Sequence, residues 1–497
     1  MIIGFLNLPR PLIPLAVALL LASCGGSGGS QTAGIDGSGA PVASNTSGTI
    51  DGFGSVIVNG VKYESNTAEI LVNGQRASEN DLRVGYQVSV TGNNNNGRSI
   101  AQKIEFIPSV VGEITALLTA EKQILVLGKT IQVTNNTVFD ASIKPASLAG
   151  LSVGQTILVS GAIAPDGSIS ATRIERSNST NLQISGQVAN LTSSSFSVNG
   201  TTVVYTNAQL INLNRERLIN GARVAAIGIM QDNQLQASTV IGLNKNLARD
   251  FASADIEGFI TRFVSATDFD VDGVSATTTN QTRYEKGSPA DLRLGVKIEV
   301  EGSINASGVL VASEVEFEQT SNNKISGTVT AITLGNNTGI ISGALEVDGT
   351  RVITTKQTRY EDKQFNLRPF NLSSLTRGDL VEVSGYSTAE GFIATKIERR
   401  EVEDEEAETR ELEGTVSALG ADYLVLFGRR IYLTENTRIT GDSGETISLS
   451  NFLLLALNQQ IELEVESRDG EFYALEIELE LEDSDEAQTA NNNAKQD

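Results

Sequence analysis

The chain has 497 residues, a formal net charge of −23, a single cysteine and neither histidine nor tryptophan. This length is too great for one compact hydrophobic core and predicts several folded units. The charge disfavours binding to nucleic acid phosphates and anionic lipid headgroups, the lone cysteine excludes an intramolecular disulfide framework, and the absence of histidine removes the commonest general base and metal ligand.

The first 23 residues have the form of a bacterial export signal. Arg10 is the only charge before an apolar stretch at 11–22, which is shorter than the about 20 apolar residues that a membrane-spanning helix needs. The stretch ends in Leu21-Ala22-Ser23-Cys24, which resembles a lipobox, the motif at which the signal peptide is removed and the cysteine is lipidated. We therefore expect residues 1–23 to be a lipoprotein signal peptide and Cys24 to be the lipidation site. An ordinary signal peptide with an incidental cysteine is the alternative.

The predicted anchor is followed by a Gly/Ser-rich segment, and residues 24–46 are expected to form a flexible tether. Glycines follow Cys24, and by resemblance to Gram-negative lipoproteins an aspartate there would retain the protein in the inner membrane. We expect an exported protein held in the bacterial cell envelope by the lipid on Cys24, with the outer membrane favoured over the inner membrane. Periplasmic and surface-exposed placements both stay open.

After the tether, an opening phrase, an L-x-x-G phrase and a closing A-x-x-I-E phrase recur in the same order along the chain. Such self-similarity is typical of tandem repeat proteins. The L-x-x-G phrase starts at Leu82, Leu151, Leu218, Leu292 and Leu375, and a degenerate copy starts at Leu455. The predicted repeats are 47–107, 110–176, 183–242, 255–318, 324–400 and 412–482, with an acidic linker at 401–411 and a disordered acidic tail at 483–497.

Each repeat is predicted to consist of short strands. Apolar and polar residues alternate, as at 296–301, which is typical of half-buried strands. Segments 145–151 and 288–292 are expected to form a helical turn before the L-x-x-G phrase. Tight hairpins between the second and third strands are indicated by Asn59-Gly60, Asn199-Gly200, Asp272-Gly273 and Asp348-Gly349.

Closure of the strands into a barrel is the simplest way to avoid exposed sheet edges in so small a unit. We therefore predict an all-β protein, a tandem array of about six small antiparallel β-barrels of the OB or SH3-like kind. A two-sheet sandwich for each repeat is the alternative.

The three repeated phrases resemble a bacterial lipoprotein family known as domain of unknown function 5666. The resemblance covers most of the chain after the tether. The third and sixth copies depart most from the pattern, at Gly242 and at Asn458, which replaces the L-x-x-G glycine, so closure of these two barrels is open. The resemblance implies no activity, no cofactor and no catalytic residues.

A calcium motif is suggested by Asp268, Asp270 and Asp272, which are spaced as in the start of an EF-hand loop. Position 12 of that loop is Thr279 rather than the bidentate glutamate that the motif requires. The same segment aligns with strand-and-hairpin segments in other repeats, so we favour a strand and a hairpin. A weak calcium site at Asp268, Asp270 and Asp272 is the alternative.

No catalytic site is predicted. The sequence contains no G-x-S-x-G elbow, phosphate-cradling glycine loop or metal-ligand cluster. Paired carboxylates could hydrolyse glycosides without histidine, but the acidic residues lie on predicted exposed strand faces or in linkers. Nothing in the pattern marks a buried acid with a raised pKa beside an ionised one, which that chemistry requires.

These observations favour a non-catalytic, lipid-anchored envelope protein whose repeat array is a binding or spacer scaffold, with no cofactor and no nucleic acid partner. An envelope protein or a glycan is the expected kind of partner. A binder would need an exposed aromatic or apolar patch; Tyr284 and Tyr360 are candidates, although packing at the barrel rim is favoured for both. A calcium-binding envelope module is the alternative, and an extracytoplasmic carboxylate-based hydrolase is the less favoured one.

Overall fold

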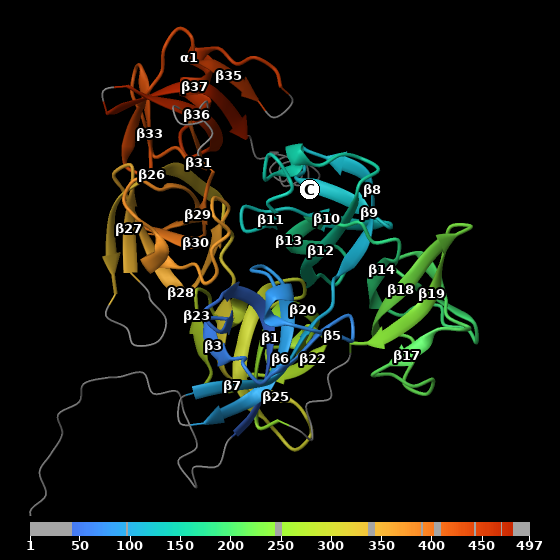
Figure 1. The fold of residues 1–497 in the computed structure, drawn as a ribbon. Helices are drawn as coiled ribbons and strands as arrows, with labels where there is room; N and C mark the ends of the chain where they lie inside the picture. Colours follow the sequence, from blue (N-terminus) through green and yellow to red (C-terminus); the bar gives the residue numbers. More distant parts are fainter. Residues whose placement is uncertain are drawn as a thin grey trace, which may run out of the picture. The chain divides into compact units, whose positions relative to one another are not determined.

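The structure is a computed structural model that describes residues 42–95, 98–243, 251–335, 343–388, 391–401, 409–441, 444–468 and 470–480. In this part of the chain, strands dominate and follow one another in six groups that correspond to the six predicted repeats (Figure 1). The predicted all-β tandem array is therefore confirmed. The predicted signal peptide, Cys24 and the acidic tail lie outside the described residues.

Repeats 1 and 2 each contain a first strand, a short second strand, an interrupted third strand and two longer strands at the end. In repeat 1 these are β1 (Val42–Gly52), β2 (Val56–Val58), β3 (Val61–Glu64), β4 (Glu69–Val72), β5 (Gln75–Ala77), a 3-10 turn (Glu79–Asp81), β6 (Gln87–Asn95) and β7 (Arg98–Phe106). In repeat 2 they are β8 (Val110–Leu118), β9 (Gln123–Val126), β10 (Lys129–Gln132), β11 (Val138–Phe139), a 3-10 turn (Leu148–Gly150), β12 (Thr156–Ile163) and β13 (Ile169–Arg176).

Repeats 3 and 4 keep this order. Repeat 3 contains β14 (Leu182–Gln187), β15 (Ser195–Val198), β16 (Thr201–Val204), β17 (Gln209–Ile211), β18 (Arg223–Gln231) and β19 (Gln234–Gly242). Repeat 4 contains β20 (Ser253–Ser265), β21 (Asp268–Val271), β22 (Val274–Thr277), β23 (Arg283–Glu285), a 3-10 turn (Pro289–Asp291), β24 (Lys297–Ile304) and β25 (Leu310–Phe317).

Repeats 5 and 6 differ from the others in detail only. Repeat 5 contains β26 (Asn323–Leu334), β27 (Gly343–Val347), a long β28 (Thr350–Asp362), a 3-10 turn (Leu372–Ser374), β29 (Leu380–Thr388) and β30 (Gly391–Arg399). Repeat 6 contains β31 (Thr409–Thr415), β32 (Ala418–Leu419), β33 (Tyr423–Leu426), β34 (Arg429–Tyr432), β35 (Arg438–Gly441), the helix α1 (Leu449–Leu455), β36 (Gln460–Arg468) and β37 (Glu471–Glu480). Within the described residues, no helix is long and apolar enough to span a bilayer.

Each repeat closes into a five-stranded barrel, as repeat 4 illustrates. β20 pairs with both β21 and β24, β21 pairs with β22, and β24 pairs with β25, all antiparallel. β22 and β23 close the ring by pairing with β25 in parallel. The strand order first-second-third-fifth-fourth is the connectivity of an OB barrel. The barrels differ from the predicted antiparallel ones in one respect. The third and fifth strands run in the same direction and lie side by side, so this one pairing is parallel.

The glycine that opens each repeat allows the second hairpin to lie directly over the first strand. A Cβ atom on Gly48 would lie 1.7 Å from Asn59 Oδ1, and one on Gly258 would lie 2.8 Å from the Cβ of Asp272. Gly414 has the same relation to Phe427 in repeat 6. These glycines are needed for close approach. A left-handed turn conformation does not account for them, because none of the three has a positive φ.

The L-x-x-G glycine does adopt the left-handed conformation that favours glycine. Gly85 has a φ of +86° and Gly221 a φ of +87°. In repeat 6, Asn458 adopts the same conformation with a φ of +63°, which asparagine tolerates better than most residues. The substitution therefore leaves barrel 6 closed. Barrel 3 closes more weakly, because its first strand meets the second through a single bridge between Ala189 and Ser197.

The barrels are joined in pairs by their first strands. In repeats 2 and 3, β8 pairs antiparallel with β14 through Val110 and Ile184. In repeats 5 and 6, β26 pairs with β31 in the same way through Ile325 and Leu412. Repeat 1 is joined to repeat 4 rather than to its neighbour in sequence, because β1 pairs in parallel with β20.

Five of the first strands begin before the predicted repeat boundaries, and β1 and β31 do so by the most residues. β1 begins at Val42, within the predicted tether, because Val42 pairs with Asn94 of β6. β31 begins at Thr409, within the predicted linker, because Thr409 pairs with Glu466 of β36. Backbone pairing, rather than apolar alternation, thus extends both strands.

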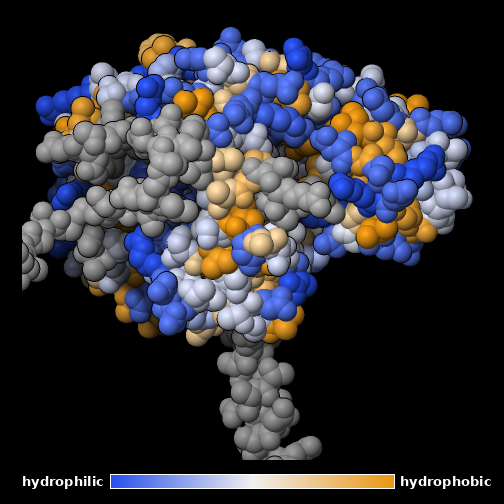
Figure 2. All heavy atoms as spheres, turned by 90° about the horizontal axis from the view of Figure 1, so that it is seen from below, coloured by the Kyte–Doolittle hydropathy of each residue, from blue (hydrophilic) through white to orange (hydrophobic). Residues whose placement is uncertain are grey.

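Hydrophobic side chains fill the barrel interiors. Repeats 1 to 4 each have their own core cluster, and that of repeat 1 also includes Val138 of repeat 2, whereas the cores of repeats 5 and 6 form one continuous cluster. The face of the molecule in Figure 2 is mostly hydrophilic, with hydrophobic patches between polar areas. This agrees with the period-2 alternation of the strands.

Candidate functional site

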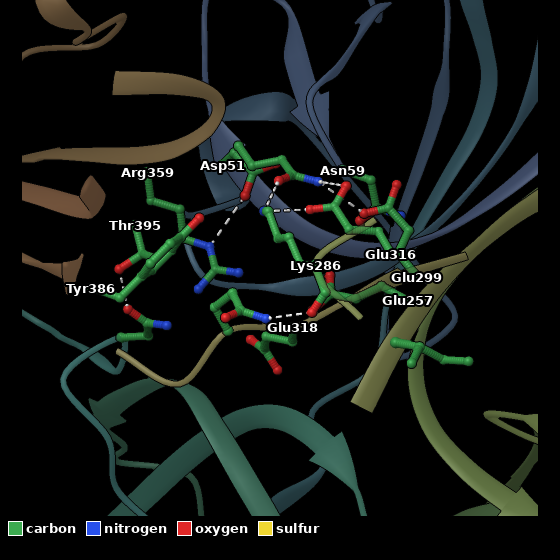
Figure 3. A pocket seen from close by; sticks show the side chains of 14 residues that line it. Asp51, Asn59, Glu257, Lys286, Glu299, Glu316, Glu318, Arg359, Tyr386 and Thr395 are labelled. Atoms are coloured by element: carbon green, nitrogen blue, oxygen red, sulfur yellow. Dashed lines mark hydrogen bonds and ion pairs between the residues drawn. The ribbon is translucent and has the colours of Figure 1, made fainter. Parts of the chain in front are cut away.

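The candidate site is a small polar cavity lined by residues from repeats 1, 2, 4 and 5. Its volume is about 90 Å³, and charged and amide side chains surround it (Figure 3). Asp51 lies at the end of β1, Glu257 on β20, Glu299 on β24 and Arg359 on β28. Contacts between repeats, rather than a motif within one repeat, therefore create this cavity.

Asp51 and Arg359 form an ion pair between repeats 1 and 5. Arg359 Nε donates to Asp51 Oδ1 over 3.1 Å, and the Gly60 amide donates to Asp51 Oδ2 over 3.0 Å. Burial raises the pKa of Asp51 to about 7, although the Arg359 guanidinium partly opposes the increase.

Glu257 lines the same cavity, and its pKa is shifted in the opposite direction. Burial would raise its pKa, but Lys297, with Nζ at 2.6 Å from Oε1, and Arg359 lower the pKa of Glu257 to about 2. The Thr49 amide also donates to its carboxylate over 2.9 Å. An acid with a raised pKa and an ionised acid therefore line one cavity, which the sequence pattern had not indicated.

The sequence distinguishes Asp51 from the equivalent residues of the other repeats. Asp51 lies three residues after the opening glycine of repeat 1, at a position where no other repeat carries a charge. The equivalent residues are Thr115, Ala189, Thr261, Thr330 and Ser417.

Asp255 and Glu299 form a second acidic pair beside the first. Asn59 Nδ2 donates to Asp255 Oδ1 over 2.8 Å, and a hydrogen bond joins the two carboxyl groups. Such a bond requires a proton on one of them. Burial raises the pKa of both groups, to about 8 for Asp255.

The remaining wall of the cavity is a network between repeats 4 and 5. Lys286 Nζ lies 2.5 Å from Glu316 Oε1, and Gln357 Nε2 donates to Glu299 and Glu316 over 3.2 Å each. Figure 3 shows Lys286, Glu299 and Glu316 of this network between the strands. The network ties repeat 5 to the barrel of repeat 4.

The geometry favours a structural role for these acids over acid-base catalysis. Both oxygens of Asp51 accept hydrogen bonds from the protein, and both oxygens of Glu257 accept from Thr49. A catalytic acid must direct its proton at a substrate. The volume of about 90 Å³ is also well below the about 300–1,000 Å³ of typical small-molecule sites.

A second charged cluster lies between repeats 2 and 5. The side chain of Arg173 on β13 is 2% exposed, and it forms ion pairs with Asp140, Glu175 and Glu361. Lys396, in the equivalent closing phrase of repeat 5, donates to the Thr137 carbonyl over 3.0 Å. The closing phrases A-T-R-I-E-R and A-T-K-I-E-R therefore each contribute a cation to this junction.

The predicted calcium residues do not converge on one point. Asp268 and Asp270 both pair with Arg262, at 2.7 Å and 2.8 Å from Nη2, whereas Asp272 pairs with Arg223 of repeat 3. Their segment is strand β21 and its hairpin turn, as we favoured. The calcium interpretation stays a prediction.

A different group of acids lies close enough together to hold a cation. The carboxylates of Glu285, Glu314 and Glu316 have oxygens within 4.8 Å of one another. Arg283 pairs with Glu285 and Glu314, and Lys286 pairs with Glu316. Basic side chains of the protein therefore already balance this group.

The two candidate tyrosines contribute to barrel packing. Tyr360 is 7% exposed and belongs to the core shared by repeats 5 and 6, and Tyr284 packs against the core of repeat 4. Neither forms an exposed aromatic patch.

Comparison with known proteins gives one match. No curated protein and no solved structure matches the chain. The sequence model of one family, described as Domain of unknown function (DUF5666), matches at 45–105, 111–175, 185–240, 257–316, 326–398 and 413–478. These segments coincide with the six barrels, and the chain therefore belongs to the DUF5666 family, with six copies of its domain in tandem.

Proposed function

We propose that the protein is a non-catalytic, lipid-anchored scaffold of the bacterial cell envelope, in which the barrels are locked together to hold binding surfaces in fixed relation. The observation that carries this proposal is the set of contacts, one strand pairing and two ion pairs, between repeats that are not adjacent in sequence. A flexible spacer has no need for them.

Three such contacts join different pairs of repeats. β1 and β20 join repeats 1 and 4, Asp51 and Arg359 join repeats 1 and 5, and Arg173 and Glu361 join repeats 2 and 5. Separation of a buried ion pair without full solvation of both partners is costly. The contacts therefore oppose independent movement of the barrels.

Hydrogen exchange resolved by repeat tests this proposal in the full chain. Arg359→Met removes the cation that repeat 5 supplies to Asp51, and Arg438→Met is the matched control. Arg438 ends the segment E-N-T-R at 435–438, which corresponds to K-Q-T-R at 356–359 in repeat 5. It is 65% exposed and pairs with Glu476 within its own repeat.

We expect Arg359→Met to accelerate exchange in β1 of repeat 1 as well as in β28 of repeat 5. The control is expected to affect repeat 6 alone. If Arg359→Met changes exchange only within repeat 5, the barrels are independent and the protein is a spacer.

A further inference from the structure

A row of three tyrosines crosses the outer surface of barrel 6. Tyr423 on β33 lies directly opposite Tyr432 on β34, which lies directly opposite Tyr473 on β37. The ring centroids are 6.4 Å apart in the first pair and 5.5 Å apart in the second, where the rings are stacked. The three rings therefore form a continuous aromatic row.

The tyrosines are not part of the barrel core. The neighbouring residues Leu424, Ile431 and Ala474 point inward and are buried, and side chains alternate along a strand. The tyrosines are half-buried on the opposite face. Filling of the barrel interior therefore does not explain them.

The other five barrels have no aromatic residue at these positions. Their hairpins have the same register, so the equivalent residues can be identified by counting from the turn. The equivalents of Tyr423, Tyr432 and Tyr473 are Ser55, Glu64 and Ile100 in repeat 1, Gln123, Gln132 and Ser170 in repeat 2, Ser195, Val204 and Gln236 in repeat 3, Asp268, Thr277 and Val311 in repeat 4, and Ala344, Ile353 and Ile393 in repeat 5. The row is thus a property of barrel 6 and not a requirement of the fold.

Charged groups of both signs flank the rings. The guanidinium of Arg430 lies 4.2 Å from the centroid of Tyr423, and that of Arg468 lies 5.3 Å from the centroid of Tyr473. The Tyr473 hydroxyl donates to Glu471 over 3.2 Å, and Glu466 pairs with Arg468. The surface therefore offers hydrogen-bond donors and acceptors and charges of both signs.

We propose that the tyrosine row of barrel 6 binds an uncharged polysaccharide chain. The proposal rests on the scaffold function and specifies the ligand of one of its surfaces. Sugar rings present C–H groups that pack on aromatic rings, and their hydroxyls match flanking donors and acceptors. The outer face of the second and third strands is where OB barrels bind extended oligosaccharides and oligonucleotides.

The net charge of the protein decides between oligosaccharides and oligonucleotides as ligands. Nucleic acids are polyanions, and the net charge of −23 opposes their approach. A neutral chain carries no charge, so the negative charge of the protein does not repel it. A neutral glycan is therefore the ligand that the surface fits.

The experiment must separate binding from sheet stabilisation, since cross-strand aromatic pairs also stabilise sheets. The residues that replace the tyrosines are those that barrel 2 has at the equivalent positions. At the equivalent positions Gln123 Nε2 donates to Gln132 Oε1 over 3.1 Å, so the double variant Tyr423→Gln, Tyr432→Gln introduces a pair that a sister barrel already carries. The matched control is Gln123→Ala, Gln132→Ala in barrel 2.

Titration calorimetry on the purified full chain without its signal peptide would use hexamers of β-1,4-linked glucose and N-acetylglucosamine, with polygalacturonate and single-stranded oligothymidylate as polyanionic probes. We expect a neutral hexamer to bind, the tyrosine double variant to bind it at least tenfold more weakly, and the barrel 2 control to bind as the original chain does. Thermal unfolding checks that both variants are folded.

Absence of binding to both neutral hexamers overturns the proposal, as does equal affinity in the tyrosine double variant. Preferential binding of a polyanion also overturns it. Because the exchange experiment on Arg359 reports on contacts between barrels alone, the scaffold proposal can fail or succeed independently of this result.

Discussion

Arg173 of repeat 2 and Glu361 of repeat 5 form an ion pair although 188 positions separate them in the chain, with Arg173 Nη1 at 3.2 Å from both carboxylate oxygens. The Arg173 side chain is 2% exposed, so water contributes little to its solvation. Its charge is therefore balanced by carboxylates from two repeats, and neither repeat alone provides the complete environment.

Substitution of Arg173 by methionine is expected to destabilise the protein strongly. It leaves Asp140, Glu175 and Glu361 without their shared cation, and loss of one partner of a buried ion pair costs about 3–5 kcal/mol. Arg283→Met is the control, because Arg283 is 63% exposed and exposed pairs contribute about 0–1 kcal/mol. Urea unfolding measures both changes, and equal effects would show that the junction is not buried in solution.

Alanine variants of two L-x-x-G glycines distinguish the cost of a strained backbone conformation from the cost of a steric clash between repeats. Gly85→Ala and Gly221→Ala both place a side chain at a positive φ, which costs about 1–2 kcal/mol. Only at Gly85 does the new Cβ also approach repeat 2, at 2.7 Å from the Thr172 carbonyl oxygen, whereas nothing lies within 4 Å at Gly221.

We therefore expect Gly85→Ala to lower the free energy of unfolding by about 1–3 kcal/mol more than Gly221→Ala does. Denaturant unfolding of the two variants measures the difference. Equal losses would mean that repeats 1 and 2 do not make this contact.

Stability is expected to fall as the pH rises from about 4 to 8. The pKa of Asp51 is raised from 3.8 to about 7 and that of Asp255 to about 8, so the folded state keeps protons that the unfolded chain has released. The stability that these protons contribute is present below pH 4 and is lost as the pH rises through the folded-state pKa values.

Glu257 and Glu398 act in the opposite direction. Their pKa values are lowered from 4.5 to about 2, so the stability they contribute above pH 4.5 is lost as the pH falls toward 2. Urea midpoints should therefore be highest near pH 4–5. Asp51→Asn should reduce the decline between pH 5 and 8, and an unchanged slope in this variant would contradict the assignment to Asp51.

Removal of the predicted lipidation site is expected to release the protein from membranes. Cys24→Ala leaves no cysteine in the chain, so no thiol remains to carry the lipid. Fractionation of cells and labelling with a radioactive fatty acid measure the effect. Labelled, membrane-bound Cys24→Ala protein would show that the anchor lies elsewhere.

Calcium is expected to leave the thermal unfolding midpoint unchanged. Arg262 already neutralises Asp268 and Asp270, and Arg223 engages Asp272, so a cation would have to displace two guanidinium groups. Calorimetric titration at near-physiological salt checks this directly. A binding heat together with a higher midpoint would support the calcium alternative.

The repeat pattern itself could be predicted from sequence because it depends on local constraints. Strand alternation, the hairpin turn at Asp272-Gly273 and the left-handed position of Gly85 each follow from the chemistry of a few neighbouring residues. Their recurrence along the chain indicated the number of barrels. Barrel closure followed from the cost of exposed strand edges.

Which repeat contacts which could be decided only by the tertiary structure. Arg359 and Arg438 occupy the same position in their repeats, yet one is buried against Asp51 of repeat 1 and the other is exposed beside Glu476. The raised pKa of Asp51 likewise depends on residues more than 200 positions away. Local sequence determines the barrel because its turns and strands are short-range, whereas the polar cavity and its charges arise from packing between barrels, and no local pattern specifies which barrels pack together.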